Sequence, residues 1–261
     1  MRPGRFPALL ALPALLAGGG ASSTAAAAHE WRAAWGAPHP FVALDERLLG
    51  RGEGLRAGLA LARPFGVPGL SFGSAWLRGV PAGWEAHAGS LRAGAYGEGH
   101  FGAGRRQRIG GQASLLLGAR LFVLEAGEEW RSAHLGATAL LGARFLKAPA
   151  VELEAGAVDL PLGGAREGPD ALLISRLAVA AGERRVVVEH ALRLGGGSAT
   201  TWAAAWPLGR LRLVQMLRAG TGEGGLSAYL RAGRLELGVG QRWHPQLGWT
   251  PVVSVSWMEE F

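Results

Sequence analysis

The stretch Thr250–Phe261, TPVVSVSWMEEF, ends the chain on a segment with two different faces. Apolar residues share one parity, and polar or charged residues share the other: Val253, Val255, Trp257 and Phe261 against Ser254, Ser256 and Glu260. This alternation predicts a β-strand with one apolar side. That side would face a core in a soluble sandwich, or lipid in a barrel that crosses an outer membrane.

The same period-two pattern recurs along most of the chain. In ASLLLGARLFV, residues 113–123, one face is apolar: Ala113, Leu115, Leu117, Ala119, Leu121 and Val123. The other face carries Ser114, Gly118 and Arg120, with Leu116 and Phe122 as exceptions. Segments 132–146, 184–194 and 233–244 alternate in the same way. The period is that of strands and not of helices.

Composition favours lipid over a second sheet as the neighbour of the apolar face. Only 18% of residues are charged and 49% are hydrophobic, whereas soluble domains contain about 25% charged residues. Most tryptophans lie near predicted strand ends, as in the aromatic girdles of membrane barrels: Trp76, Trp84, Trp130, Trp202, Trp206, Trp243, Trp249 and Trp257.

The sequence therefore predicts an all-β fold, a closed antiparallel transmembrane barrel of 12–14 strands. Turn signals such as TGEGG and LGGGS separate fourteen candidate strands. These are 54–62, 67–78, 83–96, 99–108, 111–123, 132–146, 150–159, 171–181, 184–194, 199–206, 209–219, 224–232, 233–244 and 250–260.

The chain divides into three parts, of which the barrel is the last. Residues 1–28 have the positive start, apolar stretch and small-residue end of a cleaved signal peptide. Residues 29–53 alternate poorly and are expected to form a periplasmic or plug segment, and residues 54–261 form the barrel. The sequence contains no cysteine, which excludes thiol catalysis, thiolate zinc sites and lipoprotein acylation.

Charged residues on the polar parity are predicted to form a ladder of charges inside the lumen. The predicted ladder comprises Arg56, Arg92, Arg120, Arg144, Arg193, Arg212, Arg218, Arg231, Arg242, Glu85, Glu152, Glu154, Glu189 and Glu236. In a narrow lumen these residues would pair across neighbouring strands and fill the interior. In a wider lumen, the excess of arginine would favour anions.

A second basic cluster, Arg105, Arg106 and Arg108 in GAGRRQRIGGQ, is expected at a strand end or in a surface loop. From a loop, these arginines could bind lipopolysaccharide phosphates or other anions. The formal net charge of +7 carries little weight alone, and no nucleic-acid partner is expected.

No catalytic, metal or cofactor site is predicted. His87, His134 and His244 fall on the polar parity and His190 on the apolar one. No spacing pairs any of them with a serine, and no HExxH or P-loop motif occurs. A lumen histidine that is solvated or hydrogen-bonded is the simpler interpretation.

The C-terminal third resembles the PorV/PorQ-like outer-membrane barrels, relatives of the FadL hydrocarbon-uptake channels. The matching motifs are Gly225–Ser227, Arg234–Leu237, His244–Gly248 and Ser254–Trp257. The Asn-Pro-Ala start of that group is absent, and residues 38–44 resemble it only weakly. The terminal Phe261, supported by Val253, Val255 and Trp257, resembles the signal that the barrel-assembly machinery reads.

This resemblance implies a non-enzymatic protein of the bacterial outer membrane. Its expected roles are protein export or surface attachment, with secretion-system components as partners, or a channel for small or hydrophobic molecules. Its expected contacts also include outer-membrane lipid and the barrel-assembly machinery. Two alternatives stay open, an outer-membrane lipid hydrolase that uses His87 or His134, and a soluble exported β-sandwich.

Overall fold

The structure, a computed structural model, describes residues 54–63, 68–80, 83–127, 130–147, 149–164, 171–219, 222–245 and 248–260. The strands are β1 (Gly54–Ala62), β2 (Leu70–Val80), β3 (Trp84–Ala93), β4 (Tyr96–Ile109), β5 (Ala113–Ala126), β6 (Trp130–Lys147), β7 (Ala150–Gly164), β8 (Leu172–Ala181), β9 (Arg184–Arg193), β10 (Ser198–Leu208), β11 (Leu211–Ala219), β12 (Glu223–Ala232), β13 (Leu235–His244) and β14 (Gly248–Glu260). The predicted signal peptide, the segment 29–53 and Phe261 lie outside the described residues.

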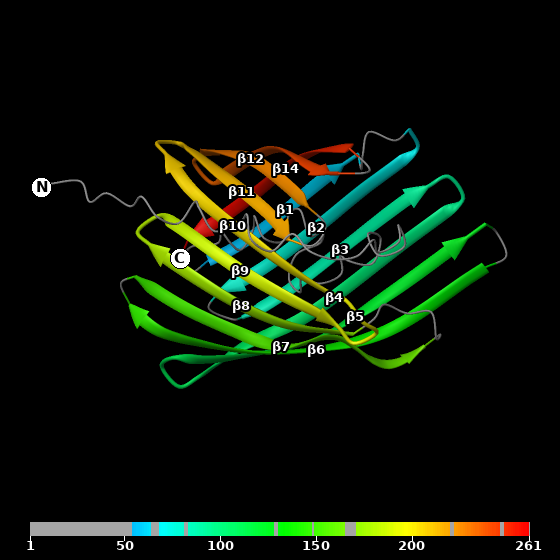
Figure 1. Cartoon of the computed structure of the whole chain (residues 1–261), viewed down its shortest axis with the longest axis horizontal. Helices are drawn as coiled ribbons and strands as arrows, with labels where there is room; N and C mark the ends of the chain where they lie inside the picture. Colours follow the sequence, from blue (N-terminus) through cyan, green and yellow to red (C-terminus); the bar gives the residue numbers. More distant parts are fainter. Residues whose placement is uncertain are drawn as a thin grey trace, which may run out of the picture.

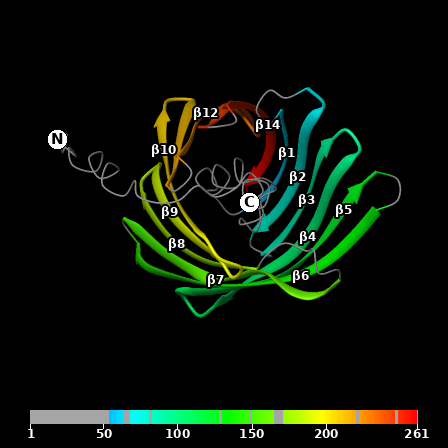
Figure 2. The same cartoon turned by 45° about the vertical axis from the view of Figure 1, so that its right-hand side comes forward.

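The sheet closes on itself. Each strand pairs antiparallel with the next one along the chain, and β1 pairs with β14 from Gly54–Glu260 to Ala62–Val252 (Figure 1). Figure 2 shows the strands running around a central lumen. The predicted closed antiparallel barrel is confirmed, with fourteen strands. The soluble sandwich is wrong, because one closed sheet leaves no second sheet to pack against.

The two faces of the barrel differ as the period-two pattern predicts. Large aliphatic side chains of the outward parity are exposed, such as Leu61 (62%) and Leu141 (57%). Side chains of the inward parity are mostly buried and mix polar with apolar groups. An apolar exterior around a partly polar interior is the pattern of a barrel in lipid.

The two ends of the barrel carry different connections. The terminal rim, where β1 begins and β14 ends, has connections of only two or three residues between its strands. The opposite rim carries longer ones, including 63–69 between β1 and β2 and 165–171 between β7 and β8. Tight turns at the terminal rim use glycines with positive φ, such as Gly182 (60°) and Gly209 (65°), a conformation that side-chain-bearing residues rarely adopt.

Strand β7 contains a bulge that changes which residues face the lumen. Ala137 pairs with Leu160 and Ala139 with Ala157, so two residues of β7, Val158 and Asp159, lie opposite the single position of β6 between those pairs. Asp159 has a φ of 58° and its side chain is fully buried. A bulge of this kind re-aims one side chain, here a carboxylate, toward the interior.

No helix among the residues described is long and apolar enough to cross a membrane.

Candidate functional site

The lumen face carries more arginine than acid. The strand register places these arginines on the lumen parity: Arg56, Arg78, Arg106, Arg108, Arg120, Arg144, Arg176, Arg185, Arg193, Arg212, Arg218, Arg231 and Arg242. The acids there, among side chains that the structure describes, are Glu85, Glu98, Glu152, Glu154, Asp159, Glu189, Glu223 and Glu236. The inner face of the barrel therefore carries an excess of positive charge, and it is the candidate functional surface.

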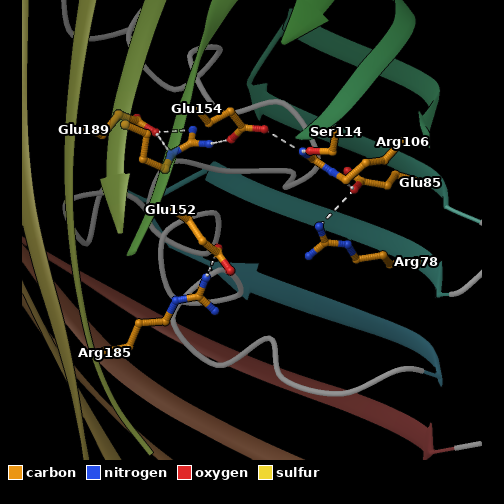
Figure 3. Close-up of polar contacts among 9 residues, drawn as sticks. Arg78, Glu85, Arg106, Ser114, Glu152, Glu154, Arg185 and Glu189 are labelled. Atoms are coloured by element: carbon orange, nitrogen blue, oxygen red, sulfur yellow. Dashed lines mark hydrogen bonds and ion pairs between the residues drawn. The ribbon is translucent and has the colours of Figure 1, made fainter. Parts of the chain in front are cut away.

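A chain of ion pairs, which we call the lumen ladder, crosses much of the wall (Figure 3). Arg78 Nη2 donates to Glu85 Oε1 at 2.9 Å, and Arg106 Nε lies 3.5 Å from the same oxygen. Arg106 Nη2 donates to Glu154 Oε1 at 2.7 Å. Arg176 bridges Glu154 and Glu189, with Nε donating to Glu189 Oε2 at 2.9 Å. Each guanidinium in the middle of the ladder thus holds two carboxylates.

Small residues let Arg106 reach a strand that is not its neighbour. Arg106 lies on β4 and Glu154 on β7, with β5 and β6 between them. The intervening lumen positions in register with Glu154 are Ser114 and Gly142. A Cβ on Gly142 would lie 2.8 Å from Ser114 Oγ and 3.8 Å from Arg106 Nη1. A small residue at position 142 therefore leaves room for the Ser114 hydroxyl and for the Arg106 guanidinium beside it.

The row of residues in register with Glu154 continues across the later strands to the opposite rim. Glu189 pairs with Thr201, and Thr201 with Arg218. Arg218 Nη1 lies 3.4 Å from Glu223 Oε2, and His244 Nε2 lies 3.5 Å from Glu223 Oε1. Because neighbouring strands are staggered in a barrel, this row runs diagonally from the terminal rim near Ser114 to the opposite rim.

Two smaller charge groups lie near the terminal rim. Glu236 accepts from Arg56 Nη2 at 2.6 Å and lies 4.0 Å from Arg212 Nη1. Glu152 lies 2.9 Å from Arg144 Nη2 and accepts from Arg185 Nη2 at 3.2 Å (Figure 3). Arg144 keeps 57% of its side chain exposed, so this group is the one most open to water.

A buried polar group surrounds the bulge of β7. Arg120 Nε lies 3.1 Å from Asp159 Oδ1, and both side chains are at most 1% exposed. The Arg120 guanidinium lies over the Phe122 ring, 5.0 Å from its centroid. The rings of His87 and His100 are 5.5 Å apart, and both are buried. This group is therefore enclosed within the protein and not a solvated surface.

Glycines provide room for the flat side chains of the lumen face. A Cβ on Gly102 would lie 2.4 Å from the His87 ring, and one on Gly58 would lie 2.2 Å from the Trp76 ring. Both rings therefore lie against the backbone of the neighbouring strand. Trp76 thus belongs to the lumen, which corrects its predicted place in an outer aromatic girdle.

Apolar side chains also face the lumen, in two groups on either side of the ladder. The first, on the opposite-rim side, comprises Leu116, Leu140, Val158, Leu172, Ile174 and Ala191. The second, on the terminal-rim side, comprises Ala178, Val187, Ala203, Ala205, Val214, Met216 and Tyr229. We call them together the apolar lumen surface. Arg176 lies between Ile174 and Ala178 on β8, so the ladder is flanked by apolar neighbours.

Most of the predicted ladder faces the lumen, and the structure changes its membership. Arg92 does not, because it pairs with Gly97 and Ser71 on the outward parity, beside the end of β3. A long arginine at a strand end can reach the membrane interface from the lipid side. Sequence reasoning missed Arg78, Arg176, Arg185, Glu98, Asp159 and Glu223, although Arg78, Arg176 and Glu223 have alternating neighbours that could have revealed their parity.

The predicted anion-binding cluster lies at the C-terminal end of β4, the strand-end alternative of the prediction, and not in a loop. Arg106 faces the lumen and belongs to the ladder, and Arg108 shares its parity through its partner Ser114. Arg105 faces outward, 5.4 Å from the ring centroid of the exposed Trp84. The three side chains are therefore divided between two faces, and they do not form one anion cradle.

The other predicted residues are placed as follows. Val253 and Val255 are outward and exposed on β14, and Trp257 shares their parity. His134 and His244 share the lumen parity, and His190 faces outward, with Nδ1 2.9 Å from Thr200 Oγ1. No group of three or more His, Asp or Glu side chains within the described ranges could hold a metal ion.

Comparisons with known proteins add little to this picture. No family model matches the chain, and no curated protein matches it. The solved KdgM porin is 9% identical, with 77% of this chain and 98% of that one covered and a TM-score of 0.45. A mutant of Rh. blastica porin is 10% identical, with 79% and 99% covered and a TM-score of 0.44. At these values we take no family, solute or partner from the likeness.

Proposed function

We propose that this chain is a non-enzymatic outer-membrane barrel that admits small anionic solutes through its lumen. The observation that carries the proposal is the excess of arginine on the inner face of a closed barrel with an apolar exterior. Charge of one sign in a narrow passage concentrates ions of the other sign. Antiparallel barrels with apolar outer belts are the form that bacterial outer membranes hold, which supports this location.

The connections of the two rims support an orientation for the barrel. Outer-membrane barrels have short periplasmic turns and longer extracellular loops. The terminal rim has the short connections, so we place it in the periplasm. The solvated Arg144–Glu152 group then lies at the periplasmic mouth, where it would meet solutes leaving the lumen.

Planar-bilayer recording of the purified full chain tests the proposal. We expect discrete current steps whose reversal potential in a salt gradient shows anion preference. The double variant Arg78→Gln/Arg144→Gln should lower that preference, because both side chains are partly exposed lumen cations. Arg131→Gln is the matched control, since Arg131 is exposed on the outer face. Steps that prefer cations, or no steps under any condition, would contradict the proposal.

Export or surface attachment is the role that the PorV/PorQ resemblance implies. It rests on the sequence motifs alone, which fall in β12, β13, β14 and their connections. Its partners would be secretion-system components, and the barrel-assembly machinery would read the last strand. Deleting the gene and measuring which proteins reach the cell surface separates this role from a channel. An unchanged surface proteome would remove it.

Hydrolysis of membrane-lipid esters is a second candidate, and one arrangement on the outer face favours it. Ser175, His190 and Thr200 lie in register on β8, β9 and β10, and Thr200 holds the His190 ring. A hydroxyl beside an oriented histidine is the arrangement of a nucleophile and its base. By contrast, His87 is buried in the lumen, away from lipid.

Fatty-acid release from vesicles tests this second candidate. It requires release by the full chain that is lost in both Ser175→Ala and His190→Ala and kept in His87→Ala. If the unaltered protein releases no fatty acid, hydrolysis is excluded and the channel proposal is unaffected.

A further inference from the structure

Two exposed arginines, Arg63 and Arg92, face outward at the opposite rim. The backbone N–H of Arg63 donates to Pro251 O at 3.3 Å, which continues the register of β1 with β14 by one pair. Arg63 therefore has the outward parity of Leu61, two residues before it. Arg92 has the same parity on β3, in register with Ser71 of β2. Both side chains thus leave the wall on its lipid-facing side.

The two arginines are close enough to share one ligand. Strand β2 lies between β1 and β3 (Figure 1), so two strand spacings, or about 10 Å, separate Arg63 from Arg92. The residue of β2 between them is Ser71, which is small and exposed and carries a hydroxyl donor. Guanidinium groups bind phosphate through paired N–H donors. Two long arginine side chains that meet over a serine therefore suit one phosphate group.

The charge of the outer face at this rim favours an anion there. Within the described strands, Glu125 is the one acid on the outward parity near this rim, and it lies 3.1 Å from Arg131 Nη2. Neither Arg63 nor Arg92 forms an ion pair with another residue of the described ranges. The excess of cations at this corner attracts a negative group.

An open apolar groove of about 670 Å³ lies on the same strands, nearer the middle of the wall. The outward residues that line it are Leu59, Leu61, Gly73, Ala75, Ala88, Ser90, Val253 and Val255. The small residues of β2 and β3 leave a depression beside the exposed leucines of β1. On the other side of the depression Phe101 is exposed, in register with Ala88. An acyl chain in this groove gains contacts on both sides.

Tryptophans indicate the depth of the two arginines in the membrane. Trp243 and Trp249 pair on the outward parity of β13 and β14 near this rim, and both are exposed. Trp249 is two residues from Pro251, the backbone partner of Arg63. Exposed tryptophan concentrates at the level of lipid headgroups. The arginines therefore lie at headgroup depth, and the groove lies at the depth of the acyl chains.

We propose that Arg63, Ser71 and Arg92 bind the phosphate of a membrane lipid, one acyl chain of which lies in the groove. The parts of the site follow one another along the wall in the same order as the parts of the lipid. The bound lipid covers the junction where β1 and β14 close the barrel. The site lies outside the lumen, so the inference does not rest on the proposed channel.

Native mass spectrometry of the full chain in detergent tests the proposal, with dioleoyl phosphatidylglycerol as the probe. Dioleoyl phosphatidylcholine, which has the same chains and no net charge, should bind more weakly. We expect Arg63→Gln/Arg92→Gln to weaken binding of the probe by about tenfold or more, because two charge-assisted contacts are lost. Arg105→Gln/Arg184→Gln is the matched control, since it removes the same charge from the outward parity near the terminal rim.

A second pair of variants tests the acyl chain. Ala75→Leu/Ala88→Leu fills the groove at two positions in register and should weaken binding of the probe severalfold. Ala119→Leu/Ala137→Leu makes the same change on an outward pair of β5 and β6 and should leave binding unchanged. The melting temperature of each variant without lipid shows whether the barrel has folded, and bound lipid should raise it.

Each outcome then decides. Weaker binding in the arginine variant and in the filled groove, with both controls unchanged, supports the site. Equal binding of the two lipids, or equal weakening in the arginine variant and its control, overturns it. Unchanged binding after the groove is filled also overturns it, because no acyl chain then lies there. Inorganic phosphate that raises the melting temperature as much as the lipid would indicate a free anion instead. The bilayer recording decides the channel proposal separately.

Discussion

Adjacent residues on the two faces of this barrel meet different surroundings. Leu140 faces inward and is fully buried, whereas Leu141 faces outward and is 57% exposed. Arg176 is buried between two carboxylates, whereas Arg131 is 74% exposed beside Glu125. On the inner face, the neighbours are protein groups held in fixed positions, and they determine how much stability a substitution removes. On the outer face the neighbour is fluid lipid or water, which adapts to a change of shape.

The largest difference between the faces is expected for charge. Arg176→Met leaves Glu154 and Glu189 without the cation that holds both, and removing one partner of a buried pair costs about 3–5 kcal/mol. Arg131→Met breaks an exposed pair, which is worth about 0–1 kcal/mol. The free energy of unfolding in urea, measured for the barrel in liposomes, checks both values. An equal loss of unfolding free energy in the two variants would show that the ladder is solvated.

Leucine truncation should give the next effect. Leu140→Ala removes a fully buried side chain, and such changes cost about 2–5 kcal/mol because a cavity remains. Leu141→Ala should cost less, because lipid fills the space that the side chain leaves. The same unfolding titration measures the pair. A loss at Leu141 as large as that at Leu140 would mean that the outer face also packs against protein.

Added methyl groups should give the smallest effect. Gly102→Ala places a Cβ 2.4 Å from the His87 ring, and overpacking of this kind costs about 1–3 kcal/mol. On the same strand, Gly99→Ala meets no atom within 4 Å and should leave stability unchanged or slightly raised. If both variants unfold alike, the His87 ring does not lie against the neighbouring strand as described.

Sequence periodicity predicted the barrel well because the constraint behind it is simple. Lipid requires an apolar side chain at every second position and leaves the other positions free. Segments such as 54–62 and 184–194 consequently match β1 and β9 almost residue for residue. The thirteen connections between the strands needed only glycine and polar residues at short intervals to be recognised.

The inner face was harder to predict because no single rule governs it. Leu116 and Phe122, exceptions to the alternation, are lumen residues of β5. The span from Arg106 to Glu154 depends on small residues of two intervening strands, which no local pattern records. Asp159 faces inward only because of a bulge. The prediction that Arg92 shares the lumen parity is wrong, because its register places it on the outward face.

Lipid contact along β5 is the most direct test of this account. Single cysteines at Leu116, Leu117, Ala119, Leu121 and Phe122 can each carry a nitroxide label in liposomes, since the chain has no other cysteine. We predict high oxygen accessibility at 117, 119 and 121 and low accessibility at 116 and 122, a period of two. Low oxygen accessibility at all five positions would contradict a barrel whose leucine face touches lipid. Accessibility that does not alternate along the strand would contradict it as well.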